Sequence, residues 1–576
     1  MLILSKSLHH FYFRRAAFAI NLRHSIFTIS NYITFIFISL LISLSISTHT
    51  YGYERVWIMF TDKGVIEQQL TEKLDSLRSG WSQNSLQRRS KAGLSLSLED
   101  LPINPIYITA VTNAGAEIVC RSKWMNAVSV AASQDVISQI EKLVFVRAAH
   151  PVASFQSSSK SLDEISSIAG EEIDVIYRDF VNNVIPLGDY GQSYIQAAHA
   201  GVIEAHRRGY TGTGVLLGML DTGFQLDHRA FAGLKLVAQY DFINGDSDPS
   251  YDSRTDKRGQ ANHGTACLSV IVGKDPGWLV GIAPGVSVVL AKTEQTNSEK
   301  RIEEDYWVEG IEWLEWLGVD VVSSSLSYRK WYTKSDFNGI TPFITRAAER
   351  ACELGVIICN SAGNAGPKDI TIGAPADALS VLAIAAVDSN RQITRFSSRG
   401  PTADGRIKPD IAALGRKVVC VKPMTWKEYS RWNGTSLSCP IVAGVACLVI
   451  EAHPDWSPDR VREALRFSAD RSFRPDYQYG YGIVNAADAI DYPCIAGRII
   501  SRKNFKGVEG LLVRLYNESF EKKRTTGENG LYKFVNVPDD NWYRMEIYDG
   551  ESVLYSTLFR DVPPSIYLDI SLDLNH

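Results

Sequence analysis

Short apolar runs separated by helical patterns fill the middle of the chain, from about residue 189 to residue 490. Five of these runs are apolar on both faces, as strands of a covered parallel sheet are; they span residues 215–220, 286–290, 319–323, 356–360 and 381–385. The stretches between them are long enough for crossover helices. The pattern therefore predicts an α/β fold in which helices flank a parallel sheet on both sides.

The segment before this sheet has another order of elements. A strand is predicted at 56–60, followed by a polar segment to about residue 100. Beyond it the pattern predicts a helix at 107–114, strands at 117–120 and 127–130, a helix at 134–143 and a strand at 144–146. Strand, helix, strand, strand, helix, strand is the ferredoxin-like α+β arrangement. No catalytic set is evident in it.

From residue 494 to the end, short alternating strands are separated by turns such as Glu528-Asn529-Gly530 and Asp549-Gly550. Strands are predicted at 498–501, 511–516, 531–534 and 543–548. Several short strands with turns between them are typical of an antiparallel β-sandwich. The third unit is therefore expected to be small and all-β.

The first thirty residues carry Arg14, Arg15 and Arg23 without an acidic residue, and an apolar stretch follows at 32–46. This is the layout of a secretory signal peptide, and the apolar stretch is shorter than the roughly 20 residues of a membrane span. We expect a secreted or cell-envelope protein. The long basic leader keeps an uncleaved membrane anchor as the alternative, and only then is a membrane expected as a partner.

These patterns divide the chain into five segments. They are a leader (1–50), the ferredoxin-like unit (53–152), a serine-rich polar linker with a predicted site of processing (153–186), the α/β unit (187–492) and the sandwich (493–576).

Composition narrows the function. An apolar fraction of 45% and a charged fraction of 22% are those of a globular protein, and a net charge of -4 offers no basic footprint for nucleic acid. The 8 cysteines form no Cys-x-x-Cys pair, which argues against a disulfide scaffold or a zinc site. Most are expected to be core thiols, with one disulfide through Cys420 or Cys494 as the alternative.

Three motifs of the α/β unit place an aspartate, a histidine and a serine in that order: Leu220-Asp221-Thr222-Gly223, His263-Gly264-Thr265 and Asn433-Gly434-Thr435-Ser436. Asp221 follows a predicted strand at its carboxyl end, where catalytic groups of open α/β sheets collect. His263 and Ser436 each begin an apolar helix. Since a serine becomes a nucleophile when a carboxylate-held imidazole takes its proton, we predict a catalytic triad.

Asn364 follows the strand at 356–360 and would complete an oxyanion hole with the N–H of Ser436. An extended polypeptide substrate is expected along two strand-like edges: Ser325, Leu326 and Ser327, and Ser361, Ala362 and Gly363. Gly363 and Gly373 indicate an open, apolar pocket for the side chain before the scissile bond. Glu303, Glu304 and Asp305 either favour basic side chains in neighbouring subsites or form a solvated helix face.

These motifs resemble those of the subtilisin-like serine proteases, which share the Asp, His, Ser order. The resemblance covers about residues 185–490 and implies that Asp221 orients His263, His263 is general base and then acid, Ser436 is the nucleophile and Asn364 stabilises the oxyanion. The ferredoxin-like unit is similar to the family's propeptide, an intramolecular chaperone and inhibitor. Residues 494–576 resemble carboxypeptidase-regulatory-like β-sandwich modules, which implies a role in stability, docking or substrate positioning.

The chain departs from the family pattern in two respects. Ser327 stands where the family has glycine, which predicts narrowed distal substrate pockets and altered preference. The usual calcium ligands are also expected to be absent: their equivalents are Ala230 and the segment 273–281, whose only carboxylate is Asp275. An acidic loop at Asp246, Asp248 and Asp252 is either a solvated turn or a cation site elsewhere. Calcium is allowed by the resemblance, but no cofactor is required.

Two further residues carry family-based expectations. Pro375 after Ala374 matches a cis-proline position, and His228 is expected to be structural because the triad is already filled.

The sequence thus predicts a secreted serine endopeptidase made as a self-processing zymogen. One rival is a catalytically silent binding protein on the same scaffold, against which the intact Asp221, His263, Asn364 and Ser436 argue. Another is a lipase or esterase of the α/β-hydrolase fold, which requires a Gly-x-Ser-x-Gly elbow and the histidine last in the chain. Ser436 meets neither requirement.

Overall fold

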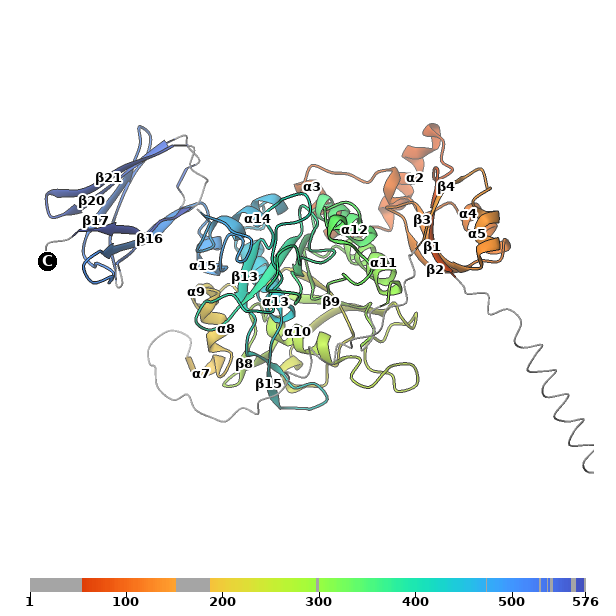
Figure 1. Cartoon of the computed structure of the whole chain (residues 1–576), viewed down its shortest axis with the longest axis horizontal. Coiled ribbons are helices and arrows are strands. Elements are labelled where there is room, and N and C mark those ends of the chain that lie inside the picture. Colours follow the sequence, from red (N-terminus) through yellow and green to blue (C-terminus); the bar gives the residue numbers. More distant parts are fainter. Residues whose placement is uncertain are drawn as a thin grey trace, which may run out of the picture.

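The computed structural model describes residues 54–151, 187–296, 300–472, 474–527, 530–535, 537–538, 542–560 and 566–573. The predicted leader (1–50) and linker (153–186) lie outside the described residues. Three units follow one another along the molecule, with the N-terminal unit and the C-terminal unit on opposite sides of the central one (Figure 1).

The central unit contains a parallel seven-stranded sheet in the order β13-β12-β11-β10-β5-β9-β6. Its strands are β5 (Leu216–Asp221), β6 (Lys235–Asp241), β9 (Ser287–Lys292), β10 (Val321–Ser324), β11 (Ile357–Ser361), β12 (Leu382–Val387) and β13 (Ile411–Leu414). The predicted fold class is confirmed. The sequence pattern missed β6, a half-exposed edge strand, and β13, which has only four residues.

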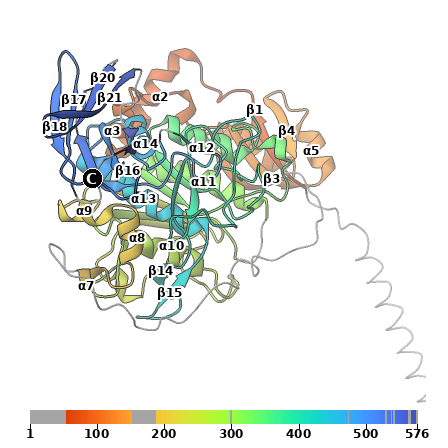
Figure 2. The same ribbon diagram turned by 60° about the vertical axis from the view of Figure 1, so that its left-hand side comes forward.

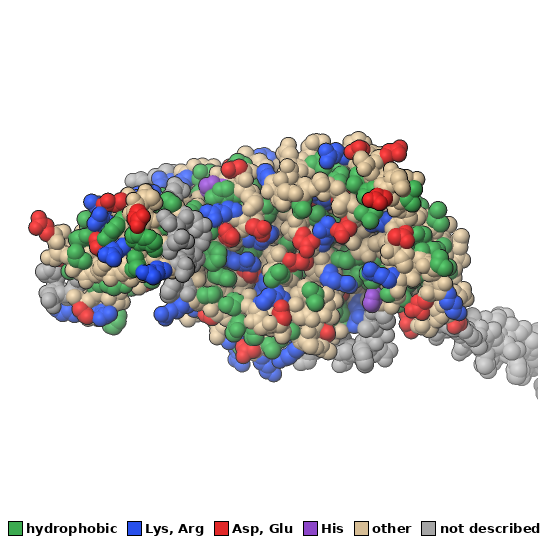
Figure 3. Space-filling model, turned by 90° about the horizontal axis from the view of Figure 1, so that it is seen from above, with side chains coloured by type: hydrophobic (Ala, Val, Ile, Leu, Met, Phe, Trp, Pro, Cys, Tyr) green, Lys and Arg blue, Asp and Glu red, His purple; other side chains and the backbone are tan. Residues whose placement is uncertain are grey.

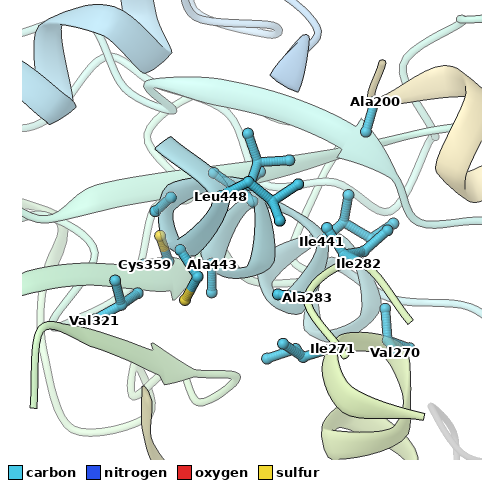
Figure 4. Packing of buried hydrophobic residues seen from close by; sticks show 14 of the residues in the cluster. Ala200, Val270, Ile271, Ile282, Ala283, Val321, Cys359, Ile441, Ala443 and Leu448 are labelled. Atoms are coloured by element: carbon cyan, nitrogen blue, oxygen red, sulfur yellow. The ribbon is translucent and has the colours of Figure 1, made fainter. Parts of the chain in front are cut away.

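Helices cover both faces of this sheet. One face packs against α10 (Asn262–Val272) and α13 (Thr435–Ala452), and the other against α11 (Ile302–Leu317) and α12 (Phe343–Glu353). In Figure 4, Ile441 and Leu448 of α13 lie among residues of β10, β11 and α10. By length and composition α13 is apolar enough to cross a membrane. However, 83% of this helix is buried inside the protein, as expected for a core helix.

Smaller elements complete the central unit. They are the helices α7 (Leu187–Tyr190), α8 (Tyr194–His199), α9 (Val202–Arg207), α14 (Pro458–Phe467) and α15 (Ala486–Ile490), and the strand pairs β7 (Lys274–Asp275) with β8 (Leu279–Val280) and β14 (Val418–Val421) with β15 (Tyr429–Trp432).

The N-terminal unit is an antiparallel sheet in the order β2-β3-β1-β4 with helices against it. Its elements are β1 (Glu54–Phe60), α2 (Glu67–Ser79), α3 (Gln83–Lys91), α4 (Pro105–Asn113), β2 (Glu117–Ser122), β3 (Ala127–Ala132), α5 (Gln134–Ile140) and β4 (Val146–Pro151). The polar segment contains two helices that the pattern missed. The buried residues of α3 are Ser85, Arg88 and Arg89, so this helix has no apolar periodicity to recognise.

The N-terminal unit packs against α11 of the central unit, and both Figure 1 and Figure 2 show the two side by side. Glu315 accepts hydrogen bonds from Arg88 (2.5 Å) and Arg89 (2.9 Å), and all three side chains are almost fully buried. Asp305 accepts from Trp57 Nε1 (2.7 Å) and Ser129 Oγ (2.5 Å). Glu312 accepts from Ser122 Oγ (2.5 Å) and the backbone N–H of Lys123 (3.0 Å). The carboxylates of α11 thus accept hydrogen bonds from several side chains of the N-terminal unit across this interface.

The C-terminal unit consists of two sheets around a small core that includes Phe534 and Met545. Its strands are β16 (Cys494–Ser501), β17 (Leu512–Tyr516), β18 (Glu521–Thr525), β19 (Leu531–Val535), β20 (Trp542–Asp549), β21 (Ser552–Arg560), β22 (Ile566–Tyr567) and β23 (Ile570–Leu572). Lys533 forms ion pairs with Asp488 and Asp491 of the central unit. On the molecular face shown in Figure 3, acidic and basic side chains are interspersed.

The cysteines whose side chains are described are free thiols, and all of them are buried. Burial raises the pKa of Cys352 and of Cys439 to about 12, which keeps both thiols protonated. The alternative of a disulfide through Cys420 is wrong, because its thiol is free and buried. The side chain of Cys494 lies outside those that the structure describes.

Lys292, at the end of β9, is a fully buried cation in the central unit. Its ammonium group lies 2.7 Å from Asp241 Oδ2 and 2.7 Å from Asp256 Oδ2, and both carboxylates are at most 3% exposed. The pairing joins the carboxyl ends of β6 and β9 to the loop that leads into α10. Because α10 begins at Asn262, directly before His263, this loop determines where His263 is placed.

Replacing Lys292 by methionine should lower the free energy of unfolding by about 3–5 kcal/mol, because two buried carboxylates lose their cation. Denaturant unfolding of the Ser436→Ala protein, with and without Lys292→Met, measures this change. The control is Lys422→Met, which removes an exposed ion pair with Glu428 and should cost at most about 1 kcal/mol. Equal effects of the two substitutions would contradict the role of Lys292.

Candidate active site

Asp221 is the last residue of β5, near the middle of the parallel sheet, and its side chain is fully buried. Its Oδ1 accepts a hydrogen bond from the backbone N–H of Thr222 (2.7 Å) and lies 2.6 Å from His263 Nδ1. A carboxylate at this place holds the imidazole with Nδ1 protonated and leaves Nε2 free to take a proton. The expected Asp221–His263 pair is therefore formed.

His263 lies in the first turn of α10, and close packing brings it to Asp221. A β-carbon on the next residue, Gly264, would lie 2.3 Å from the carbonyl oxygen of Gly223, so no other residue fits there. The backbone N–H of Gly264 donates to Thr222 Oγ1 (3.2 Å). This contact explains why a glycine accompanies the histidine and a threonine accompanies the aspartate.

The charges around His263 alter its basicity. Burial alone would lower the pKa of the imidazole, but the neighbouring Asp221 carboxylate and the Cys267 side chain outweigh it and raise the pKa well above its ordinary value of 6.5. The surroundings of His263 therefore favour its imidazolium form.

Ser436 is the second residue of α13 and is 7% exposed. Cys267 Sγ lies 4.0 Å from each ring nitrogen of His263 and donates to the carbonyl oxygen of Ser436 (3.3 Å), so both residues surround one sulfur atom. The Ser436 hydroxyl donates to the carbonyl oxygen of Ser325 (3.2 Å). A rotation of the Ser436 side chain is thus needed before it bonds to His263, as in many enzymes without substrate.

Asn364 has its amide oriented by α13. Its Oδ1 accepts hydrogen bonds from the backbone N–H (3.0 Å) and the hydroxyl (3.1 Å) of Thr435, which leaves Nδ2 as a donor. A β-carbon at Gly434 would lie 3.6 Å from the N of Ser436 and 3.8 Å from Asn364 Nδ2. Both predicted oxyanion donors therefore lie close to Gly434.

The two predicted substrate edges differ in the bonds that they already make. The carbonyl oxygen of Leu326 accepts from Asn360 and Ser361, whereas within the described chain the backbone N–H and C=O of Ser327 have no partner. On the second edge, Ala362 N–H bonds to Ile384 and Gly363 N–H to the hydroxyl of Thr435. The edge at residues 325–327 therefore offers free backbone groups to a substrate.

One expectation about the substrate pockets is wrong. The pocket beside Gly363 and Gly373 is not open and apolar, because the hydroxyl of Ser327 lies between these two glycines. The reason lies in the crossing of segments more than 30 residues apart, which no local pattern encodes. The expectation that Ser327 narrows distal pockets stays a prediction.

The acids of α11 also differ from both expectations. Glu303, Glu304 and Asp305 are 0%, 7% and 2% exposed, so they form no solvated face and line no open subsite. Glu304 accepts from the hydroxyl of Tyr332 (2.9 Å), and Asp305 faces the N-terminal unit. The charges that the sequence places on a surface are covered by another part of the same chain.

His228 and Pro375 have the surroundings expected of them. His228 is 3% exposed; its Nδ1 accepts from the N–H of Ala230 (3.1 Å) and its Nε2 donates to the carbonyl oxygen of Glu428 (3.0 Å). Burial lowers its pKa. The Ala374-Pro375 peptide bond is cis.

The only carboxylate of the segment 273–281, that of Asp275, is already paired with other side chains. Asp275 Oδ2 lies 2.6 Å from Arg229 Nε and accepts a hydrogen bond from the hydroxyl of Tyr429, and Arg229 lies over the ring of Trp278. Calcium takes six to eight oxygen ligands. In the acidic loop, Asp246 and Asp248 accept backbone N–H groups of their own loop, and Asp252 pairs with Arg254.

Two groups of functional residues were not predicted. Thr222, Thr265 and Thr435 tie the motifs together: Thr265 Oγ1, for example, accepts from the N–H of Gln225 (2.8 Å). Their presence in every motif was the signal. Cys267, one helical turn after His263, touches both catalytic residues, and the i, i+4 spacing would have placed it on the same face of the helix.

Comparison with protein families agrees with this geometry. Residues 212–482 match the model of the Subtilase family, and residues 55–166 match the Peptidase S8 propeptide domain of Bacteroidota. The second match covers the N-terminal unit that packs on α11.

Individual relatives are similar across these regions. Serine protease AprX of Bacillus subtilis is 29% identical over 325 residues, which are 51% of this chain and 70% of that protein. Subtilisin E of Bacillus subtilis is 28% identical over 380 residues (65% and 89%), and Subtilisin DY of Bacillus licheniformis is 32% identical over 289 residues (50% and 94%).

Among solved structures, fervidolysin from Fervidobacterium pennivorans, a keratinolytic enzyme related to subtilisin, has a similar fold. The superposition has a TM-score of 0.53 at 18% sequence identity and covers 91% of this chain and 78% of that chain. At this identity the similarity concerns the fold alone.

We predict that replacing Asp221 by asparagine lowers the pKa of His263, because it removes the negative charge that stabilises the protonated imidazolium form. Titration of the imidazole NMR signals in the Ser436→Ala precursor measures this directly. Without the Asp221 substitution, His263 should stay protonated well above pH 6.5; with it, deprotonation should move to lower pH. An unchanged midpoint would show that Asp221 does not set the basicity of His263.

Proposed function

This chain belongs to the subtilase family of serine proteases, and from that premise we propose that it is an endopeptidase which is secreted as a propeptide-inhibited precursor and processes itself. The observation that carries this proposal is the pairing of Asp221 with His263 beside Ser436, with the amide of Asn364 facing the same place. Extended polypeptides are its substrates.

The reaction begins when the Ser436 hydroxyl rotates from Ser325 toward His263 Nε2. The imidazole takes the proton as Ser436 Oγ attacks the scissile carbonyl carbon. The resulting oxyanion is held by the backbone N–H of Ser436 and by Asn364 Nδ2; one such donor contributes about 2.7–4 kcal/mol to the transition state. His263 then donates its proton to the leaving amine, and a water molecule activated by the same imidazole hydrolyses the acyl-enzyme.

The contacts of the propeptide domain support its role as an inhibitor and folding template. Its α3 and its sheet bury the acidic face of α11 through the pairs of Glu315, Glu312 and Asp305. A helix with several carboxylates on one face is costly to form alone, because like charges repel and each buried acid needs a donor. The propeptide supplies these donors.

Two further parts of the proposal rest on the sequence and on side-chain pairing. The basic and then apolar leader supports export to the cell envelope or the medium. The ion pair of Asp275 with Arg229 supports a 273–281 loop that needs no calcium ion, since a guanidinium group already neutralises its only carboxylate.

A catalytically silent binding protein is the second candidate, and one experiment separates the two. We expect a fluorophosphonate probe to label Ser436 in the wild-type protein, since the activated hydroxyl attacks phosphorus as it attacks a carbonyl. Ser436→Ala should remain unlabelled and should accumulate as a chain longer than the wild type by the propeptide. Mass spectrometry of both secreted proteins measures these outcomes.

A matched control is Ser438→Ala, which removes a buried hydroxyl from the same helix but leaves Ser436 in place. This variant should be labelled and processed like the wild type. A folded, processed wild-type protein without label at Ser436 would refute the enzyme proposal, and equal masses for wild type and Ser436→Ala would refute self-processing.

The propeptide complex should weaken as the pH rises from about 4 to about 7. Burial raises the pKa of Asp305 to about 7 in the complex, although the hydrogen bonds from Ser129 and Trp57 oppose this shift. The exposed carboxyl of the free enzyme would titrate near 4. Between these values the complex holds a proton that the separated parts lack. Each such group therefore weakens the complex by about tenfold per pH unit in this window, with no further loss above it.

The measurement is size-exclusion chromatography of the processed protein, blocked by fluorophosphonate, at pH 5 and pH 7.5. We expect more propeptide to remain bound at pH 5, and Asp305→Asn to reduce the difference. Asp459→Asn, at an exposed position on α14, is the control and should behave like the wild type. A wild-type complex that is equally stable at both pH values would contradict the prediction.

A further inference from the structure

The hydroxyl of Ser327 occupies space that two glycines leave empty beside the nucleophile. A β-carbon on Gly373 would lie 2.2 Å from Ser327 Oγ, and one on Gly363 would lie 2.9 Å from it. Three segments of the chain thus meet around this oxygen atom. Any side chain that enters between the two glycines has to share the space with it.

This space adjoins the reacting carbonyl. Gly363 directly precedes Asn364, and its N–H donates to Thr435, the neighbour of Ser436. On the opposite side, Ser325 accepts the hydrogen bond of the Ser436 hydroxyl, two residues before Ser327. A substrate whose carbonyl oxygen lies between Asn364 Nδ2 and the N–H of Ser436 therefore directs the side chain before the scissile bond between residues 325–327 and 361–363.

The far side of the space is closed as well. Arg329 Cγ would lie 3.0 Å from the same β-carbon position on Gly373, and the guanidinium of Arg329 donates to the carbonyl oxygen of Ile372 (2.6 Å). The guanidinium also lies over the ring of Phe337. Because the guanidinium of Arg329 is held by these two contacts, the Ser327 side chain cannot withdraw in that direction to admit a larger group.

The Ser327 hydroxyl is itself unsatisfied. Its oxygen is buried and has no hydrogen-bond partner among the described residues. Leaving a buried hydroxyl without a hydrogen-bond partner costs free energy. A large apolar side chain would leave this cost in place and would also clash, whereas a small one fits, and a serine hydroxyl would supply the missing partner.

We propose that Ser327 restricts this protease to substrates with glycine, alanine or serine immediately before the scissile bond. The inference rests on the proposed function and adds the substrate class to it. One surplus methylene group in a pocket changes kcat/KM by roughly 10- to 200-fold, and leucine and phenylalanine exceed alanine by several carbon atoms. We therefore expect discrimination of at least about 100-fold.

The test uses the processed enzyme and four peptides that differ only in the residue before the scissile bond, which is alanine, serine, leucine or phenylalanine. Fluorophosphonate titration first counts the active sites, and kcat/KM is then measured for each peptide. The wild type should prefer alanine and serine over phenylalanine by at least about 100-fold. Ser327→Gly should raise the ratio of kcat/KM for the phenylalanine peptide to kcat/KM for the alanine peptide by at least about 10-fold, with Ser327→Ala in between.

Ser335→Gly removes the side chain of an exposed serine and should leave every ratio unchanged. A labelled wild-type enzyme that cleaves the phenylalanine peptide as well as the alanine peptide overturns the size restriction alone, even if Ser327→Gly does not fold. So does a folded Ser327→Gly enzyme with unchanged ratios. A folded, processed protein that neither takes up the label nor cleaves any peptide overturns the proposed function, and the restriction with it.

Discussion

A carboxylate sealed inside the sheet, that of Asp221, is the constraint on which the active site depends. A buried charge is tolerated only with donors around it, and here one donor is a backbone N–H and the other is His263. The second bond requires α10 to begin close to the end of β5. Gly264 makes that approach sterically feasible, and the loop held by Lys292 leads into it. The position of the imidazole is therefore a consequence of how one acid is satisfied.

The elements that the sequence predicted well are those whose burial is uniform. The runs that became β5, β9, β10, β11 and β12 are apolar because both faces of the sheet are covered, so their composition alone identifies them. The helix α3 was missed for the opposite reason: its buried face consists of Ser85, Arg88 and Arg89. A buried polar face is visible only together with its partner Glu315, which lies 226 residues further along the chain from Arg89.

The candidate site likewise contains residues that the sequence predicted and residues whose surroundings it did not predict. Asp221, His263, Ser436 and Asn364 were predicted because each belongs to a local motif, and the fold brings the first two into direct contact. The surroundings that shape specificity have no such motif. The Ser327 side chain occupies space left by Gly363 and Gly373. The Asp275 carboxylate is paired with Arg229 and Tyr429. These pairings arise from the crossing of loops, which periodicity and propensity do not describe.

The contacts between α11 and the N-terminal sheet have an implication for regulation by other proteins. They join side chains of two separately folded units, so they do not depend on the covalent link between them. A different chain that presents two arginines and a hydroxyl-bearing sheet with the same spacing would meet the same carboxylates. If the N-terminal unit is removed as proposed above, α11 would expose these carboxylates as a surface on which a separate chain of that chemistry could dock.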